Sequence, residues 1–585
     1  MRLTFVLLAA TVAGPLLAYF GYLDWLWAVL GLLVFGALLV RWVRRQPHPR
    51  LDKVRAGLAP RASSATTAIK TGDASRRQHG LASAMEIHRH GSAATVKKLA
   101  PVVRPSLAGE RVTPDQVGVK LCKVGQQTVW ASVEDFILAV AGPRSWKSSW
   151  LASSLVDYPG SAIATSLRPD LYTNTAHHRR SRGPVYVFNA TSIDGLDKCV
   201  TFNPLTGCSS PEIAIERAED MVPAATGEQK HWADLARSAL ASLMHAAALG
   251  DHSMDVVQKW VADPDQHKDT VIRLLRGSTS RAVVEDARQF FDCNDRTRSS
   301  ITTSIMPALR WLQFSVARRA AGLDGDASPF RVEDLLDHHA TLYVLGRVEN
   351  ATSPLMGALT GYVARNAERR AATTLTGRLD PPLGLHLDEA ADSKPPLPQW
   401  TSTMGGSGIT IKAVFQSRAQ MIEAWGKEGA GIILNNAGAV MLGGGTKDPD
   451  DLSAWSELAG KRDERTETTD GSGKVTSASQ RQVPVLPPSA LANMPPGQVV
   501  VFRRGMLPAI GRVQMIWERR DLKKVEHLPV ETTPGVETAI STPQQDTTPP
   551  PWRTPRETTT PPVETAVVDY LLPAPREEVE TDAER

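Results

Sequence analysis

The sequence predicts an α/β protein whose parallel sheet is covered by helices on both faces and interrupted by an all-helical insertion. Apolar strand patterns alternate with helical patterns over residues 111–210 and again over 329–525. The residues between them, 211–328, show helical spacing only. Such alternation is typical of parallel sheets with helices on both sides. The two flanking segments are therefore expected to form one domain, and the insertion another.

The strands of the expected sheet are short apolar runs. They are residues 129–132, 136–141, 162–165, 185–188, 340–345, 383–388, 409–415, 439–442 and 499–502. A helix is expected over 147–156, directly after the second run. The polar stretch 463–480 predicts an exposed hairpin or loop. In the insertion, Trp232, Leu235 and Ala239 recur at helical spacing and predict its core.

The N-terminus carries two apolar runs of membrane-spanning length. Residues 3–20 and 25–40 are nearly free of charge, and each can cross a hydrocarbon core of about 30 Å. They predict a transmembrane hairpin within residues 1–45. Arginines that follow it, such as Arg41 and Arg44, place the bulk of the chain in the cytoplasm and predict a multi-pass protein of the plasma membrane. A cleaved signal peptide is the alternative for the first run, but a second run follows at once without a clear cleavage site.

Charge is distributed unevenly along the chain. The net charge is +4, yet residues 526–585 carry twelve acidic and four basic side chains. This Pro/Thr/Glu-rich acidic tail is expected to be disordered. Residues 46–110 are predicted as a loosely structured basic linker with one short helix, which either contacts a polyanion or anionic lipid or is simply solvated. The four cysteines lack metal-ligand spacing, so neither a zinc site nor a disulfide framework is predicted.

A strand that runs into a loop and then a helix predicts a phosphate site. The loop ends in Lys147-Ser148, which offer an ammonium and a hydroxyl to phosphates and their metal ion. The candidate nucleotide-binding residues are Gly142, Pro143, Arg144, Ser145, Trp146, Lys147, Ser148 and Ser149. Trp146 stands where the general pattern has glycine. Either the loop is adapted to the indole and the protein still hydrolyses nucleotide, or the chain binds nucleotide poorly.

A second strand ends in two adjacent carboxylates, Asp388 and Glu389. One carboxylate can hold a magnesium shell while its neighbour polarises a water, the division of labour that phosphoryl transfer needs. The alternative is an N-cap and first-turn pair for the next helix. The position at a strand end favours catalysis. His386, two residues earlier, is interpreted as a strand histidine rather than a metal ligand.

The chain resembles the type IV secretion coupling proteins, in the TraG/TraD branch found in actinobacterial elements. Six successive motifs carry the resemblance over residues 1–520, and they begin at Ala141, Ala164, Thr201, His386, Gly405 and Phe415. The resemblance implies a RecA-like P-loop NTPase domain with an inserted all-α domain and a membrane hairpin. It assigns Lys147 to the β- and γ-phosphates, Ser148 and Asp388 to magnesium, Glu389 to the attacking water and Gln416 to a γ-phosphate sensor.

The same resemblance implies an ATP- and Mg²⁺-dependent DNA translocase. Its expected partners are DNA bound without sequence specificity, a relaxase, the channel components of the secretion system, the membrane and further copies of the chain in a homo-hexamer. Many members have glycine at the position of Trp146, and several have an arginine near 405–407 that this chain lacks. Arg418 or Arg503 could act across a subunit boundary instead, although a surface role is the simpler interpretation. The alternatives are an FtsK-like pump for double-stranded DNA and a degenerate, non-hydrolysing membrane scaffold.

Overall fold

The computed structural model describes the chain from residue 76 to residue 522. The ranges left out between them are 77–78, 192–195, 197–198, 223–224, 226, 228, 326–327, 348–350 and 470–474. The predicted membrane hairpin (1–45) and the predicted disordered tail (526–585) lie outside the described residues. Within the described part, no helix has both the length and the apolar character needed to cross a membrane.

An eleven-stranded sheet organises the described chain, with the strand order β2-β1-β13-β12-β9-β3-β8-β7-β4-β6-β5. The strands from β9 to β5 in this order pair in parallel. Those parallel strands are β3 (Ile137–Val140), β4 (Ala162–Ser166), β5 (Val185–Asn189), β6 (Thr341–Leu345), β7 (Leu383–Leu387), β8 (Ile409–Phe415) and β9 (Ala439–Leu442). The predicted α/β class is confirmed, and the predicted parallel pairing is confirmed for these seven strands. It is wrong for the expected strands at 129–132 and 499–502, which pair antiparallel.

The rest of the sheet is an antiparallel extension. It consists of β12 (Gln498–Arg503), β13 (Met506–Arg512), β1 (Gly118–Val124) and β2 (Gln127–Ser132). The apolar patterns predict β2 and β12 but miss β1 and β13. Lys120 and Lys123 interrupt β1, and Pro508 and Gly511 interrupt β13, so their strand signals are weak.

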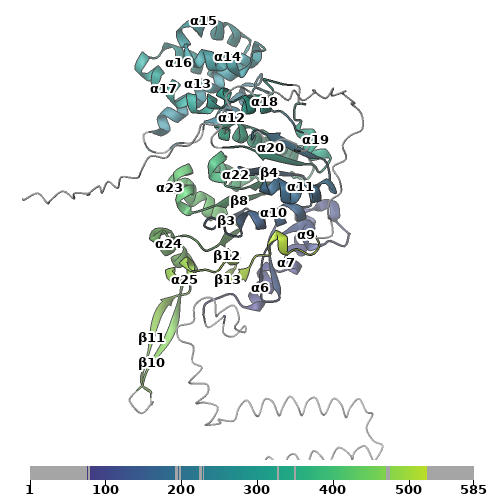
Figure 1. Ribbon diagram of the computed structural model, residues 1–585, viewed down its shortest axis with the longest axis vertical. Helices are drawn as coiled ribbons and strands as arrows, with labels where there is room; N and C mark the ends of the chain where they lie inside the picture. Colours follow the sequence, from purple (N-terminus) through teal and green to yellow (C-terminus); the bar gives the residue numbers. More distant parts are fainter. Residues whose placement is uncertain are drawn as a thin grey trace, which may run out of the picture. The chain divides into compact units, whose positions relative to one another are not determined.

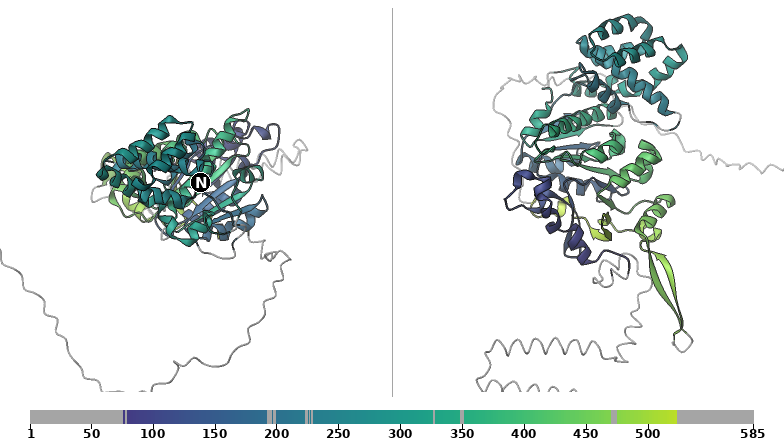
Figure 2. Two further views of the ribbon diagram at one scale, coloured as in Figure 1. Left: turned by 90° about the horizontal axis from the view of Figure 1, so that it is seen from above. Right: turned by 180° about the vertical axis from the view of Figure 1, so that it is seen from behind.

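Side chains alternate between two cores, one on each face of the sheet. Along β3, Leu138 and Val140 join one core, while Ile137 and Ala139 join the other, as the two-residue period of a strand requires. The first core includes residues of α20 (Ser353–Ala372), α21 (Ala390–Ser393), α22 (Leu397–Thr403), α23 (Arg418–Asn436), α24 (Pro449–Ala459) and α25 (Pro488–Ala492). The second core includes residues of α10 (Lys147–Asp157) and α11 (Asp170–Arg180). Figures 1 and 2 show the helices on both faces.

Helices alone fill the described chain between residues 211 and 320. They are α12 (Pro211–Met221), α13 (Gln229–Leu249), α14 (Met254–Ala262), α15 (Pro264–Leu274), α16 (Arg281–Asp292), α17 (Asp295–Leu309) and α18 (Ser315–Ala320). α19 (Val332–Asp337) then leads into β6. α12 packs on α20 beside the sheet, where the almost fully buried Asp220 forms an ion pair with Arg365. Figure 1 shows the other helices gathered beyond α12.

The expectation of a loose basic linker over 46–110 is wrong for its described part. Residues there form α6 (Ala84–Gly91), α7 (Ala93–Lys98) and α8 (Ala100–Val103), and α9 (Pro114–Val117) follows. Val96, Val103 and Trp130 share a small core that joins α7 and α8 to β2. The apolar side chains of these helices are short and lie among many charges, so the sequence shows little helical periodicity. The helices are stabilised by packing against the sheet, which a local pattern does not reveal.

The polar stretch 463–480 lies within a hairpin of β10 (Lys461–Thr469) and β11 (Val475–Pro484). Its strands pair only with each other. Figure 1 shows the hairpin extending beyond α24 and α25. The prediction of an exposed hairpin or loop is confirmed as a hairpin.

Buried Arg179 ties α11 to the helix that carries the phosphate loop. Its side chain is 0% exposed and donates at 2.7 Å to the carbonyl oxygens of Tyr158 and Gly160 and to the hydroxyl of Thr341. The bonded carbonyls belong to the turn that follows α10. A cation is favourable at this end of a helix, because the last carbonyl groups have no partner within the helix.

Arg179→Met is expected to lower the free energy of unfolding by about 2 kcal/mol, because buried carbonyl oxygens lose their donors. Urea denaturation followed by tryptophan fluorescence measures the change. The matched control is Arg180→Met at the next, exposed position, where a change within about 0.5 kcal/mol is expected. Equal losses in both variants would contradict this role for Arg179.

Candidate functional site

The loop between β3 and α10 lies at the carboxyl edge of the parallel strands. Its backbone is held by the segment after β9: Gly142 N–H donates to the Gly444 carbonyl oxygen at 3.0 Å. A Cβ atom at Gly142 would approach the backbone of Gly445 to 2.9 Å. The close contact of two backbones requires glycine at position 142. Nothing larger fits without moving the loop.

The Lys147 side chain folds back over the loop. Its ammonium donates to the carbonyl oxygens of Ala141 and Gly142, the latter at 2.7 Å, and the residue is only 6% exposed. Burial lowers the pKa of Lys147, while the nearby carboxylates of Asp388 and Glu389 act in the opposite direction. A cation held by two carbonyls at a loop and helix start is placed to exchange them for phosphate oxygens.

The next residue, Ser148, reaches the end of β7. Its hydroxyl donates to Asp388 Oδ2 at 3.2 Å. Asp388 N–H donates to the Thr165 carbonyl oxygen at 3.1 Å, which fixes the carboxylate beside β4. Burial and the neighbouring Glu389 raise the pKa of Asp388 to about 6. A hydroxyl and a half-buried carboxylate in contact offer two of the six oxygen ligands of a magnesium shell, which substrate phosphate and water can complete.

Glu389 and Gln416 meet beside that pair. Gln416 follows β8, and its side-chain amide donates to Glu389 Oε1 at 3.1 Å. Glu389 adopts a left-handed backbone with φ 51° and ψ 54°, a conformation that is costly for a residue with a Cβ and that concentrates at functional sites. Its side chain makes no capping hydrogen bond to α21. This geometry supports the catalytic interpretation over the N-cap alternative.

Trp146 packs into the core on the α10 face of the sheet. Its side chain is 1% exposed and meets Trp150 edge to face, with ring centroids 6.4 Å apart. Gly443 makes the room, because a Cβ there would lie 2.6 Å from the indole nitrogen. The bulky residue is thus accommodated inside the protein, opposite a glycine on another strand end.

The other loop residues have different environments. Pro143 and Arg144 are exposed, and Arg144 is left-handed with φ 54°. The buried Ser145 hydroxyl has no hydrogen-bond partner among the described residues. Ser149 Oγ accepts the backbone N–H of Ile516 at 2.7 Å. The structure therefore brings Lys147, Ser148, Asp388, Glu389 and Gln416 together and turns Trp146 and Ser149 toward other parts of the protein.

A buried amine and imidazole lie beneath the site. His386 on β7 and Lys412 on β8 are direct register partners, and Lys412 Nζ is 2.9 Å from His386 Nε2. Burial lowers the pKa of both groups well below their usual values. The interpretation of His386 as a strand histidine agrees with this pairing. No cluster of three or more His, Cys, Asp or Glu able to hold a metal occurs in the described chain.

Two features of the site escaped the sequence reasoning. Gly443-Gly444-Gly445 follow an apolar strand, a signal that could have marked a close backbone contact. The segment around Ile516 carries no comparable signal.

Arg503, considered above as a residue that acts across a subunit boundary, lies away from the site. It pairs with Ala439 at the amino end of β9, at the opposite edge from the phosphate loop, and its side chain is 3.4 Å from Asp135.

A profile described as "Type IV secretory system Conjugative DNA transfer" matches residues 92–537. The chain belongs to this family of conjugative DNA transfer proteins. This match confirms the resemblance to type IV secretion coupling proteins that the sequence motifs indicated. No curated protein sequence matches the chain.

Solved structures of the bacterial conjugative coupling protein TrwB are similar to this coupling protein in fold. The unbound monoclinic form shares 18% identity at a TM-score of 0.53, covering 72% of this chain and 92% of that one. The complex with the GTP analogue GDPNP shares 17% sequence identity at a TM-score of 0.53, and the match covers 73% of this chain and 93% of that one. The complex with ADP and Mg²⁺ shares 17% sequence identity at a TM-score of 0.51, and the match covers 72% of this chain and 92% of that one. The RecA-like fold class is thereby shared.

Trp146→Ala in this coupling protein is expected to lower the free energy of unfolding by about 3–5 kcal/mol, because it leaves a cavity in the core on the α10 face. Chemical denaturation of the purified chain measures the loss. Trp517→Ala, at an indole that is 64% exposed, serves as the matched control and should cost far less. If both variants lost the same stability, the packing described for Trp146 would be wrong.

Asp388→Asn is expected to stabilise the coupling protein at neutral pH in the absence of Mg²⁺. The folded-state pKa of about 6 lies above the usual carboxyl value of about 3.9. The stability associated with this group is therefore fully present below about pH 4 and is lost as pH rises through about 6. The advantage of the variant should grow over that window to about 3 kcal/mol.

Denaturation at a series of pH values measures this difference. Asp450→Asn, at an exposed position on α24, is the control and should show no such growth. An advantage that is constant between pH 4 and pH 7 would contradict the raised pKa.

Proposed function

We propose that this coupling protein is an ATP-driven, Mg²⁺-dependent motor that moves DNA into a type IV secretion channel. The observation that carries the proposal is the convergence of two strand ends: Ser148 contacts Asp388, and Gln416 contacts Glu389, beside the Lys147 ammonium. These are the group types that phosphoryl transfer requires. TrwB has been solved with ADP and Mg²⁺ and with the ATP analogue ADPNP, which supports the same ligands here.

Each side chain has a distinct role in the proposed reaction. Lys147 exchanges its two carbonyl partners for β- and γ-phosphate oxygens, and backbone N–H groups of residues 144–149 surround the phosphates. Ser148 and Asp388 hold Mg²⁺, which neutralises charge on the transferring phosphate. Glu389 accepts hydrogen bonding from the attacking water, and Gln416 fixes the orientation of Glu389. The packing of Trp146 in the core leaves the phosphate loop free to bind ATP for hydrolysis. It therefore disfavours the non-hydrolysing scaffold.

The proposed assembly extends beyond the described residues. The proposal includes the membrane hairpin that the sequence predicts within residues 1–45, which makes the protein a multi-pass plasma-membrane protein with its bulk in the cytoplasm. Residues 111–210 and 329–525 form the motor, 211–328 the all-α domain, and 526–585 an acidic tail. Further copies complete a homo-hexameric ring. Contacts of the ring with DNA phosphates carry no sequence information, so substrate choice rests on the relaxase, the all-α domain and the tail.

Lys147→Ala and Glu389→Gln are expected to fail at different steps. Lys147→Ala should abolish nucleotide binding, because the phosphates lose their cation. Glu389→Gln should still bind ATP but release phosphate about 10²–10⁴-fold more slowly, since it loses the group that polarises water. Binding of a fluorescent ATP analogue and DNA-stimulated phosphate release by the purified full chain measure the two steps.

The matched control for both variants is Glu423→Gln, at an exposed acidic position on α23, which should leave both steps intact. DNA-stimulated release that continues unchanged in Lys147→Ala would overturn the motor proposal. A wild-type chain with no affinity for ATP would favour the scaffold instead.

A further inference from the structure

The last described segment of the coupling protein, residues 513–522, lies along α10 and is called the strap here. It follows β13 and includes the short 3₁₀ helix η5 (Ile516–Glu518). Ile516 N–H donates to Ser149 Oγ at 2.7 Å in the first turn of α10. Arg519 donates to Asp157 Oδ1 at 2.7 Å at the last residue of α10. The strap is thus attached at both ends of the helix that begins with Lys147.

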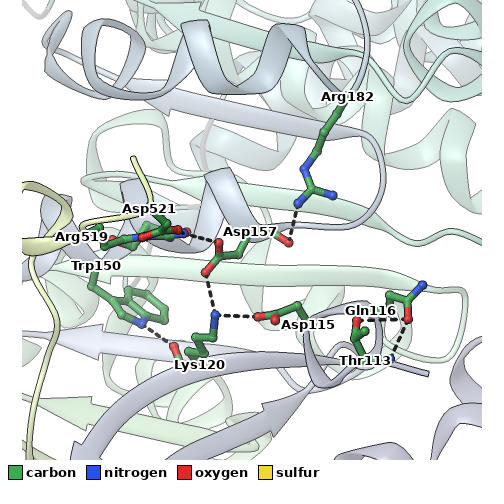
Figure 3. A network of polar contacts seen from close by, with 10 residues as sticks. Thr113, Asp115, Gln116, Lys120, Trp150, Asp157, Arg182, Arg519 and Asp521 are labelled. Carbon is green, nitrogen blue, oxygen red and sulfur yellow. Dashed lines mark hydrogen bonds and ion pairs between the residues drawn. The ribbon is translucent and has the colours of Figure 1, made fainter. Parts of the chain in front are cut away.

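The attachment near Asp157 is part of a wider polar network (Figure 3). Arg519 also donates to Asp521 Oδ2 at 2.6 Å and to the Ser153 carbonyl oxygen at 3.2 Å. Lys120 lies 3.2 Å from the other oxygen of Asp157. Arg519 is only 7% exposed, and charge-assisted bonds at a buried site are strong. The path of the strap over α10 is therefore well determined.

Trp517 is the exception to this burial. Its neighbour Ile516 is 8% exposed and belongs to the core, whereas the Trp517 side chain is 64% exposed. A single exposed apolar residue needs no explanation by itself. Here, however, the indole sits on a fixed turn one residue from the contact with Ser149. Ser149 directly follows the two residues proposed to hold phosphate and magnesium.

The strand order gives the direction in which a bound nucleotide would extend. From β3, the sheet leads through β8 to β7 on one side and through β9 and β12 to β13 on the other. Asp388 and Gln416, which the proposal places near the γ-phosphate, follow β7 and β8 and lie on that side of β3. The strap arrives from β13 and meets Ser149. A nucleotide whose γ-phosphate points to Asp388 therefore carries its nucleoside toward the strap.

We infer that Trp517 is the platform on which the base of the bound nucleotide stacks. The inference rests on the proposed function, because it takes the triphosphate position from Lys147 and Ser148. Every purine offers the same aromatic face, so stacking holds the base without identifying it. The expected ligands are adenine and guanine nucleoside triphosphates, bound with little discrimination between them.

The test compares Trp517→Ala with Trp517→Phe in the purified full chain. Removal of a stacked aromatic costs about 1–3 kcal/mol per base, which corresponds to between about fivefold and about a hundredfold in affinity. Trp517→Ala should raise KM for ATP and for GTP by a similar factor in that range and leave kcat within about twofold of wild type. Trp517→Phe, which keeps an aromatic face, should retain most of the affinity. Leu507→Ala, on β13 and 45% exposed, is the control and should change neither constant.

Three results would overturn the inference: unchanged KM in Trp517→Ala, an equal rise of KM in Leu507→Ala, or a fall in kcat with KM retained. Lys147→Ala in the same assay separates this failure from failure of the proposed function. If Lys147→Ala loses nucleotide binding while Trp517→Ala behaves as wild type, the motor proposal stands and the stacking platform does not. If Lys147→Ala binds ATP normally, the motor proposal itself fails.

Discussion

Parallel pairing of β3, β8 and β7 is the constraint on which the site depends. Parallel strands direct all their carboxyl ends to one edge of the sheet, so three segments far apart in sequence meet there. Ile137 pairs with Lys412, and Lys412 pairs with His386. This register sets Gln416 between the phosphate loop and the two acids. A shift of one residue in either pairing would reverse the faces of the strand and separate the groups.

The site concentrates features that oppose stability. The half-buried carboxylate of Asp388 with its raised pKa, the left-handed Glu389 and the buried ammonium of Lys147 lie close together at the site. The carboxylate and the ammonium are unfavourable in the absence of a ligand, and a divalent cation and a polyanion supply the opposite charges that they lack. The left-handed backbone of Glu389 is a separate, steric cost. The extensive cores on both faces of the sheet hold these groups in position. The two hydrophobic cores therefore stabilise the fold, while the charged groups at the strand ends form the binding site.

Prediction from sequence succeeded where a local pattern was strong. The runs around Ile137, Ile163 and Leu342 are largely apolar, because both faces of a parallel strand are buried, and all of them are strands. It failed at β1, where two lysines interrupt the apolar pattern, and at α6–α8, whose short apolar faces become meaningful only against the sheet. For the site, Lys147, Ser148, Asp388, Glu389 and Gln416 were predicted as one group. Gly443 and the strap were not, because their roles come from contacts with distant residues.

The amino-acid sequence by itself determined the strands and helices that have a strong apolar pattern and the chemical groups available at their ends, since both follow from short-range periodicity and side-chain chemistry. The tertiary structure decided whether those groups meet and where Trp146 goes. Its indole could have blocked the loop, and only the glycine contributed by the end of β9 makes a place for it in the core. Such complementarity between residues almost three hundred positions apart depends on sheet order and register, which no local pattern encodes.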